Sequence, residues 1–381
     1  MIKIKSVISE ELKEYYHREM LSIIRSKYDD VKIIGNIGSS MEVVLSSLFE
    51  DENGKFNLNK AREVLTEPFS DKSRNSNLFF DNYYKCSMFL FYNHTALEMK
   101  LKNEKPLAAR REKRKEYIAS FANEWLNKQL VSNPDYFQSN EKAKVLFDDV
   151  RIMMNDINNQ ISRLIDYSSL SSELRHELLS SINVNVCPYC NRQYTTSYKK
   201  DAENRTMAYL DHFYPKSKFQ LYSLSLYNFI PSCANCNSRF KIDRNIDILF
   251  PYEQGFDDDA YFKVVPTAPF DIKSLIGTSN EFEIDIHVNE HSTFKDKIEG
   301  NIEMFELKSI YQSHKQYVRD LLYKTTAYSP KYKKMLNEVF DEKMTELQFR
   351  LFLFGYTGSE SELHNKPLSK LTNDILRDYD F

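Results

Sequence analysis

The stretch from Cys187 to Lys241 reads CPYCNRQYTTSYKKDAENRTMAYLDHFYPKSKFQLYSLSLYNFIPSCANCNSRFK. It opens with one Cys-x-x-Cys pair and carries a second pair near its end. Each pair can form a tight turn whose thiolates point at one ion, and two pairs supply the four ligands of a tetrahedral structural zinc site. We therefore predict that one Zn²⁺ ion is bound by Cys187, Cys190, Cys233 and Cys236.

The spacing of the pairs is unusual for a simple zinc ribbon. Between Cys190 and Cys233 lie 42 residues, 191 to 232, whereas a plain double-pair motif leaves about 15 to 20. A larger structure must be inserted between the pairs. A redox Cys-x-x-Cys motif is the alternative, but it would leave the second pair unexplained. The fifth cysteine, Cys86, has apolar neighbours, which favours an ordinary buried thiol.

The inserted residues contain two β-prone runs. The first ends at Asp211-His212, and the second covers Tyr227 to Ile230 before a turn at Pro231. A helix can begin at the second cysteine pair. The expected order is strand, loop, strand, cysteine turn and helix, with His212 ending one strand, Asn228 on the next and Asn237 near the helix start.

The segments CPYC, LDHFYPKS and YNFIPSCANCNSRFK together resemble the HNH (ββα-metal) nuclease family, in its form stapled by zinc on four cysteines. The resemblance is confined to a small part of the chain. It implies a catalytic His212 supported by Asn228, and Asp211 and Asn237 as ligands of a catalytic Mg²⁺ or Mn²⁺ ion. Asn237 stands where the family name has its last His, which is a common variant.

The expected chemistry explains the residue types. A neutral imidazole, with a reference pKa near about 6.5, can accept the proton of the attacking water. Mg²⁺ prefers oxygen ligands and would stabilise the charge that develops in the transition state. Asn228 is expected to brace the loop between the strands and so to aim the His212 ring. Four neighbours are expected to contact phosphates flanking the cut: Lys216, Ser217, Arg239 and Lys241.

The remainder of the chain is predicted to be mostly helical. The whole is expected to be an α+β protein with a helical region at 1–180, the HNH module at 181–252 and a mostly helical region at 253–381. Ser172 is a plausible N-cap for the last helix before the cysteines. Long amphipathic segments are expected to form helices over 8–28, 76–103, 107–130 and 141–167.

The net charge of the chain limits how it can bind nucleic acid. The 381 residues carry a net charge of −3, so contact with nucleic acid must come from a local basic patch or through a partner. The densest basic run, residues 105–117, is either a solvated helix face or a helix that contacts DNA or a partner. The chain starts with charged residues and has no apolar run of about eighteen residues, so we expect a cytoplasmic protein without a membrane span.

Two flanking segments, FPYEQGF and HNKPLSKLTNDIL, also look like bacterial HNH proteins of phage-defence operons, such as the nuclease subunit of Septu-type systems. That resemblance implies a DNA-cleaving effector paired with a regulatory ATPase, and the helical regions would then dock the ATPase or a second copy of the chain. Two alternatives stay open. One is an RNA- or tRNA-cleaving nuclease on the same fold, and the other is a non-catalytic, zinc-dependent binding or scaffold subunit.

Overall fold

The computed structural model describes residues 1–4, 8–33, 39–70, 76–200, 203–242, 244–269, 271–328, 330–341, 343–355 and 363–379. The chain forms two compact units. The cysteine unit comprises Met1–Val7, His176–Asp211 and Ile230–Phe381, and the helical unit comprises Ile8–Arg175 and His212–Phe229. The segment expected to be a single HNH module contributes residues to both units.

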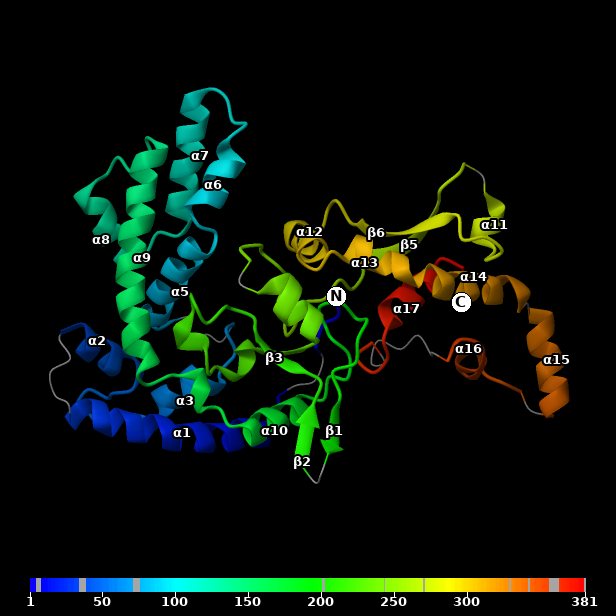
Figure 1. Cartoon of the computed structure of the whole chain (residues 1–381), viewed down its shortest axis with the longest axis horizontal. Helices are drawn as coiled ribbons and strands as arrows, with labels where there is room; N and C mark the ends of the chain where they lie inside the picture. The colour runs from blue at the N-terminus through cyan, green and yellow to red at the C-terminus, as the bar shows by residue number, and fades with distance from the viewer. Residues whose placement is uncertain are drawn as a thin grey trace. The chain divides into compact units, whose positions relative to one another are not determined.

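The helical unit is built from α1 (Glu10–Ile33), α2 (Ser39–Leu48), α3 (Leu58–Thr66), α5 (Leu78–Phe91), α6 (His94–Leu101), α7 (Leu107–Ser120), α8 (Glu124–Ser132) and α9 (Asn140–Ser162), with the 3-10 turns η1 (Tyr167–Ser169), η2 (Gln220–Tyr222) and η3 (Leu226–Asn228). In α1 a row of side chains at every fourth position is buried: Leu12, Tyr16, Met20, Ile24 and Tyr28. This row is the apolar face of an amphipathic helix. Helices α5 and α8 pack against α9 (Figure 1).

Two segments expected as single helices are each divided by an asparagine. The expected helix over 76–103 is two helices, because Asn93 has a positive φ of 44° and its side chain accepts a hydrogen bond from the Ala96 N–H. Asn123 likewise caps α8 through the N–H groups of Trp125 and Leu126 and so separates α8 from α7. Asparagine side chains compete with the helical backbone and favour helix starts.

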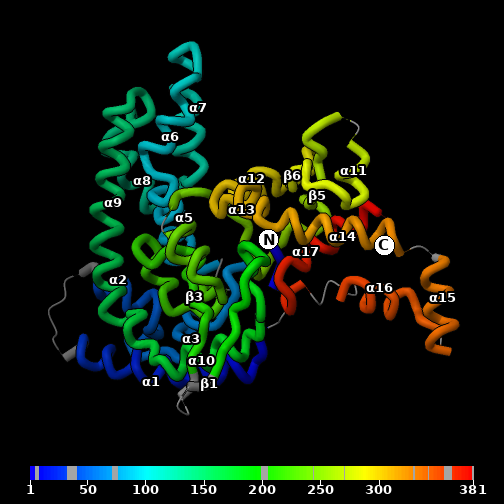
Figure 2. Tube along the Cα trace, turned by 45° about the vertical axis from the view of Figure 1, so that its right-hand side comes forward, coloured from blue at the N-terminus to red at the C-terminus, as the bar shows by residue number. Residues whose placement is uncertain are grey.

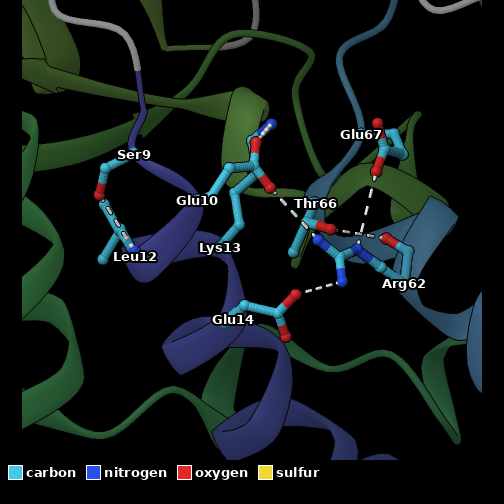
Figure 3. A network of polar contacts seen from close by, with 8 residues as sticks. All are labelled: Ser9, Glu10, Leu12, Lys13, Glu14, Arg62, Thr66 and Glu67. Carbon is cyan, nitrogen blue, oxygen red and sulfur yellow. Dashed lines mark hydrogen bonds and ion pairs between the residues drawn. The ribbon is translucent and has the colours of Figure 1, made fainter.

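Arg62 of α3 ties this helix to α1 (Figure 3). Its guanidinium donates to the carboxylates of Glu14 and Glu10, and its Nε lies 4.0 Å from Glu67. Lys13 also donates to Glu10, at 2.8 Å. This network is largely exposed, so it orients the two helices more than it stabilises them.

The cysteine unit holds the hairpin of β1 (Ser197–Lys200) and β2 (Glu203–Thr206), the hairpin of β5 (Ala260–Pro266) and β6 (Phe282–Val288), a six-residue π-type helix η4 (Cys236–Lys241), and the elements α11 (Ile272–Leu275), α12 (Lys295–Met304), α13 (Leu307–Tyr311), η5 (Gln312–His314), α14 (Lys315–Ala327), α15 (Pro330–Phe340), α16 (Glu346–Phe354) and α17 (Ser369–Arg377). Both hairpins are antiparallel, with Ser197 opposite Thr206 and Ala260 opposite Val288. Helix α17 packs on β5 and against α14 (Figure 2).

A buried ion pair within α17 holds the aspartate that bonds this helix to the β5–β6 hairpin. The Lys370 ammonium lies 2.7 Å from Asp374 Oδ1, and both side chains are almost fully buried. Asp374 Oδ2 also accepts a hydrogen bond from the Phe262 N–H of β5. Burial raises the pKa of Asp374, although the Lys370 charge acts in the opposite direction. The segment HNKPLSKLTNDIL therefore belongs to the core of the cysteine unit.

Three elements cross the division between the units: α10 (Ser172–Ile182), β3 (Tyr209–His212) and β4 (Phe229–Ser232). The N-cap of α10 is Ser171 and not the expected Ser172, because the Ser171 hydroxyl accepts from the Leu174 N–H. Strands β3 and β4 pair in a two-stranded sheet. The second strand begins later than expected, so Asn228 lies in the 3-10 turn η3 instead of on the strand.

The described residues thus combine many helices with small two-stranded sheets, as the α+β prediction expects. No helix among them is both long and apolar enough to cross a membrane.

Candidate functional site

The four cysteines of the two pairs come together in the cysteine unit. Their sulfur atoms all lie within 4.8 Å of one another, and all four residues are buried. The Cys190 and Cys233 sulfurs are 3.9 Å apart. A tetrahedron with metal–sulfur bonds of about 2.3 Å has sulfur–sulfur edges of about 3.8 Å. The cluster therefore fits one tetrahedral metal ion, which confirms the prediction that the cysteines converge on a common metal-binding position.

Matching backbone turns aim the two pairs. The N–H of Asn191 donates to the Cys187 carbonyl at 2.8 Å, and the N–H of Asn237 donates to the Cys233 carbonyl at 3.0 Å. Each pair is thus closed by the asparagine that follows its second cysteine. The Tyr311 hydroxyl adds a 2.6 Å hydrogen bond to the Cys190 carbonyl.

The charges of the cluster also call for a cation. Hydrogen bonds from the other thiols, that of Cys187 first, lower the pKa of Cys233. Burial raises the pKa of Cys187. The four cysteines would bind a divalent metal as thiolates, and the charge of the metal would offset the cost of burying them.

Asn191 connects the first cysteine pair to the C-terminal segment, which sequence reasoning did not foresee. Its Oδ1 accepts from the Lys370 N–H at 2.9 Å, and its Nδ2 donates to the Leu363 carbonyl. Its own carbonyl accepts from the Leu368 N–H. The only local signal is an Asn directly after the cysteine pair, which does not reveal a partner more than 170 residues away.

Asp211 lies in the same unit as the cysteines and is buried, with 4% of its surface exposed. The Tyr189 hydroxyl, from inside the first cysteine pair, donates to Asp211 Oδ2 at 2.7 Å. The Lys241 ammonium lies 3.1 Å from the same oxygen and 3.3 Å from Oδ1. A divalent cation on this carboxylate would be repelled by the ammonium. The arrangement therefore does not fit Mg²⁺ on Asp211 while Lys241 stays where it is.

Lys241 differs from its expected position. A phosphate contact was expected at the surface, but the residue is 3% exposed and ends η4 beside Asp211. The cause is the buried Asp211 carboxylate, which needs a counter-charge. Asn237, the other expected cation ligand, is half-buried, and its Nδ2 makes a long 3.4 Å contact to the Ser238 hydroxyl.

His212 follows Asp211 in sequence and belongs to the helical unit. Its Nε2 lies 3.0 Å from the Ser223 carbonyl oxygen. Because a carbonyl only accepts, this contact places the proton of the neutral ring on Nε2 and leaves Nδ1 as the basic nitrogen. The ring also makes edge contacts with Tyr167 at 4.6 Å and Phe229 at 5.3 Å between ring centroids.

Asn228 is fully buried and holds the loop that carries the Ser223 carbonyl. Its Oδ1 accepts from the Tyr214 N–H, and its Nδ2 donates to the carbonyls of Tyr214 and Tyr222. Tyr222 immediately precedes Ser223, so the amide fixes the backbone next to the oxygen that contacts His212. These bonds give a physical basis for the bracing role expected of Asn228.

The other expected phosphate contacts are exposed: Lys216, Ser217 and Arg239. Lys216 lies over the Tyr167 ring, 5.4 Å from its centroid. The Arg175 guanidinium also lies over this ring, 4.8 Å from its centroid, and sequence reasoning did not single it out. The basic run expected as a solvated or contacting helix face is mostly exposed on α7, except Arg114, which is buried and paired with Glu98.

Comparison of the chain with protein-family models, with curated proteins and with solved structures finds no match.

Proposed function

We propose that the chain is an endonuclease of HNH type that hydrolyses DNA phosphodiester bonds, with His212 as general base. The observation that carries the proposal is the 3.0 Å contact of His212 Nε2 with the Ser223 carbonyl. It selects the tautomer in which Nδ1 can take a proton. In this tautomer of the neutral ring, Nδ1 is the nitrogen that would take the proton of the attacking water.

In the proposed reaction, Nδ1 of His212 accepts a proton from water as the water oxygen attacks phosphorus. The phosphorus bond to the 3′ oxygen then breaks, and this oxygen leaves as an alkoxide that takes a proton from solvent water. Asn228 takes no proton in this scheme, because its amide serves three backbone groups of the loop. Asn228 is therefore a positioning residue that acts through Ser223.

Zn²⁺ on the four cysteines is the second part of the proposal. Four sulfur ligands and burial are typical of a closed structural zinc site, which has no open position for substrate. The ion would hold β3, β4 and η4 in place through the two cysteine turns. The chemistry would thus depend on zinc for geometry only.

The expected Mg²⁺ or Mn²⁺ on Asp211 and Asn237 stays a prediction, and it requires Lys241 to leave Asp211. The saturated Asp211 carboxylate favours a second candidate function from a different class, namely a non-catalytic, zinc-dependent binding or scaffold subunit. The role in phage defence, the ATPase partner, self-association and the cytoplasmic location also stay predictions. An adjacent ATPase gene and co-elution of the two products on gel filtration would support the partner.

The test incubates plasmid DNA and, separately, structured RNA with the purified chain in Mg²⁺, Mn²⁺ or EDTA. Cleavage of DNA in the metal-containing reactions supports the proposed function. Cleavage of RNA alone supports the RNA nuclease alternative. If neither substrate is cut, with or without the partner ATPase, the scaffold candidate replaces the nuclease.

A further inference from the structure

Two cationic side chains of the helical unit lie over one aromatic ring. The Arg175 guanidinium is 4.8 Å from the Tyr167 ring centroid, and the Lys216 ammonium is 5.4 Å from it. The same ring makes an edge contact with His212, at 4.6 Å between centroids. An aromatic ring attracts cations to its face, so Tyr167 holds two positive charges next to the proposed general base.

Arg175 has no anionic partner among the described residues. Its side chain is half-buried, and its Nε is buried without a hydrogen-bond partner. Arg114 of the same unit is, in contrast, paired with a carboxylate. Its guanidinium donates to both carboxylate oxygens of Glu98, at 2.8 and 3.0 Å. A guanidinium presents donors in a fork that matches a carboxylate or a phosphate. The buried Nε cannot reach an external anion, so the two Nη groups are the donors that Arg175 would offer to one.

Two further charged residues, Lys27 and Asp166, contact η1. The Lys27 ammonium donates to the Ser169 hydroxyl at 2.7 Å. The Asp166 carboxylate is the acidic group nearby, and hydrogen bonds from Ser168 lower its pKa first, with smaller effects of Lys27 and Lys216. Arg175, Lys216 and Lys27 thus contact residues of η1, and the Asp166 carboxylate caps it. We name Tyr167, Arg175, Lys216 and Lys27 the Tyr167 cluster.

We propose that the Tyr167 cluster binds a backbone phosphate of the DNA strand that His212 cuts, with Arg175 as the bidentate contact and Lys216 as a point charge. This inference rests on the proposed nuclease function and extends it to a residue outside the inserted segment. Tyr167 pre-positions both cations, which reduces the side-chain ordering that binding would otherwise require.

The test measures binding of a fluorescent DNA duplex by anisotropy across a salt series, in buffer without divalent cations and with the probe checked for integrity on a gel. Arg175→Gln and Lys216→Gln are compared with the wild type. Each is expected to reduce the slope of log affinity against log salt by about 0.9 and to weaken binding about tenfold at low salt. Arg175→Lys keeps the charge, so it should retain the slope and lose only part of the affinity.

A matched control comes from another cation–ring pair of the same unit. Arg18 is exposed and lies 5.5 Å from the Tyr15 ring centroid. Arg18→Gln should leave the slope unchanged. Lys216 is exposed, so Lys216→Gln tests the inference even where Arg175→Gln folds poorly.

The outcomes separate this inference from the nuclease proposal. A wild-type slope and wild-type affinity in Lys216→Gln, together with undiminished affinity in Arg175→Lys, overturns the inference. His212-dependent cleavage in the same preparations would leave the nuclease proposal standing. A wild type that neither binds nor cuts DNA overturns both. A reduced slope in both Gln variants, with an unchanged control, supports the phosphate site whether or not the chain cuts.

Discussion

The hydroxyl of Tyr189 donates a 2.7 Å hydrogen bond to Oδ2 of Asp211. Tyr189 stands between the two cysteines of the first pair, so the metal cluster and the buried carboxylate share one short structural link. A disturbance of the cluster should therefore reach Asp211 through this side chain.

Tyr189→Phe removes that link and little else. We expect unchanged zinc content, a loss of about 1–2 kcal/mol in the free energy of unfolding, and reduced cleavage per folded molecule. The control is Tyr311→Phe, which removes another buried hydroxyl, bound to the Cys190 carbonyl. Chemical denaturation should show similar losses of stability for the two variants. Cleavage rates should fall only for Tyr189→Phe. Equal cleavage in both variants would refute the link.

Lys241→Met leaves the Asp211 carboxylate buried without its counter-charge. We expect the free energy of unfolding to fall by about 3–5 kcal/mol. The double variant Lys241→Met with Asp211→Asn should restore part of this loss. The control is Lys370→Met, which breaks the other buried pair of the same unit. If Lys241 keeps divalent cations off Asp211, Mn²⁺ should raise the melting temperature of Lys241→Met and not that of Lys370→Met. Equal responses to Mn²⁺ would contradict a cation site at Asp211.

Cys187→Ser and His212→Ala should distinguish a residue that supports folding from one that acts in cleavage. Cys187→Ser is expected to lose zinc, measured by elemental analysis, and to lose the cooperative melt of the cysteine unit. His212→Ala should keep both. Cys86→Ser is the matched control, because Cys86 is also fully buried but lies outside the cluster, and burial raises its thiol pKa to about 12. Retained zinc in Cys187→Ser would contradict the four-cysteine site.

Asn228→Ala withdraws an amide that serves three backbone groups of a buried loop. We expect a loss of about 2–4 kcal/mol in the free energy of unfolding and a fall in cleavage among the molecules that remain folded. Asn301→Ala is the comparison, since Asn301 is equally buried and bonds the Leu249 N–H. It should cost stability without changing cleavage per folded molecule. Unchanged cleavage in Asn228→Ala would remove the proposed positioning role.

The sequence allowed the convergence of the four cysteines to be predicted, because ligand spacing is a local property. The two Cys-x-x-Cys pairs each form a short turn, and the residue types leave few other uses for them. The ends of β3 and the start of α9 could also be approximated, since apolar periodicity and capping residues act over a few positions.

The surroundings of Asp211 and His212 could not be predicted in the same way. Nothing local shows that Tyr189 reaches Asp211, or that a lysine expected at the surface is buried as its partner. The loop of residues 213–228 is held by the N-terminal helices, as when the Tyr16 hydroxyl donates to the Leu224 carbonyl, 208 positions away. Such contacts depend on tertiary packing and leave no periodic signal in the chain.

The most direct measurement of the central claim compares His212→Ala with His94→Ala in cleavage of supercoiled plasmid. His94 is a close match, because its Nε2 lies 3.1 Å from the Asn140 carbonyl and its ring makes an edge contact with Phe147. Both variants should melt like the wild type. We expect His94→Ala to nick and linearise the plasmid at the wild-type rate, and His212→Ala to slow cleavage by at least about a hundredfold. Wild-type cleavage by His212→Ala would contradict the role of His212 as general base.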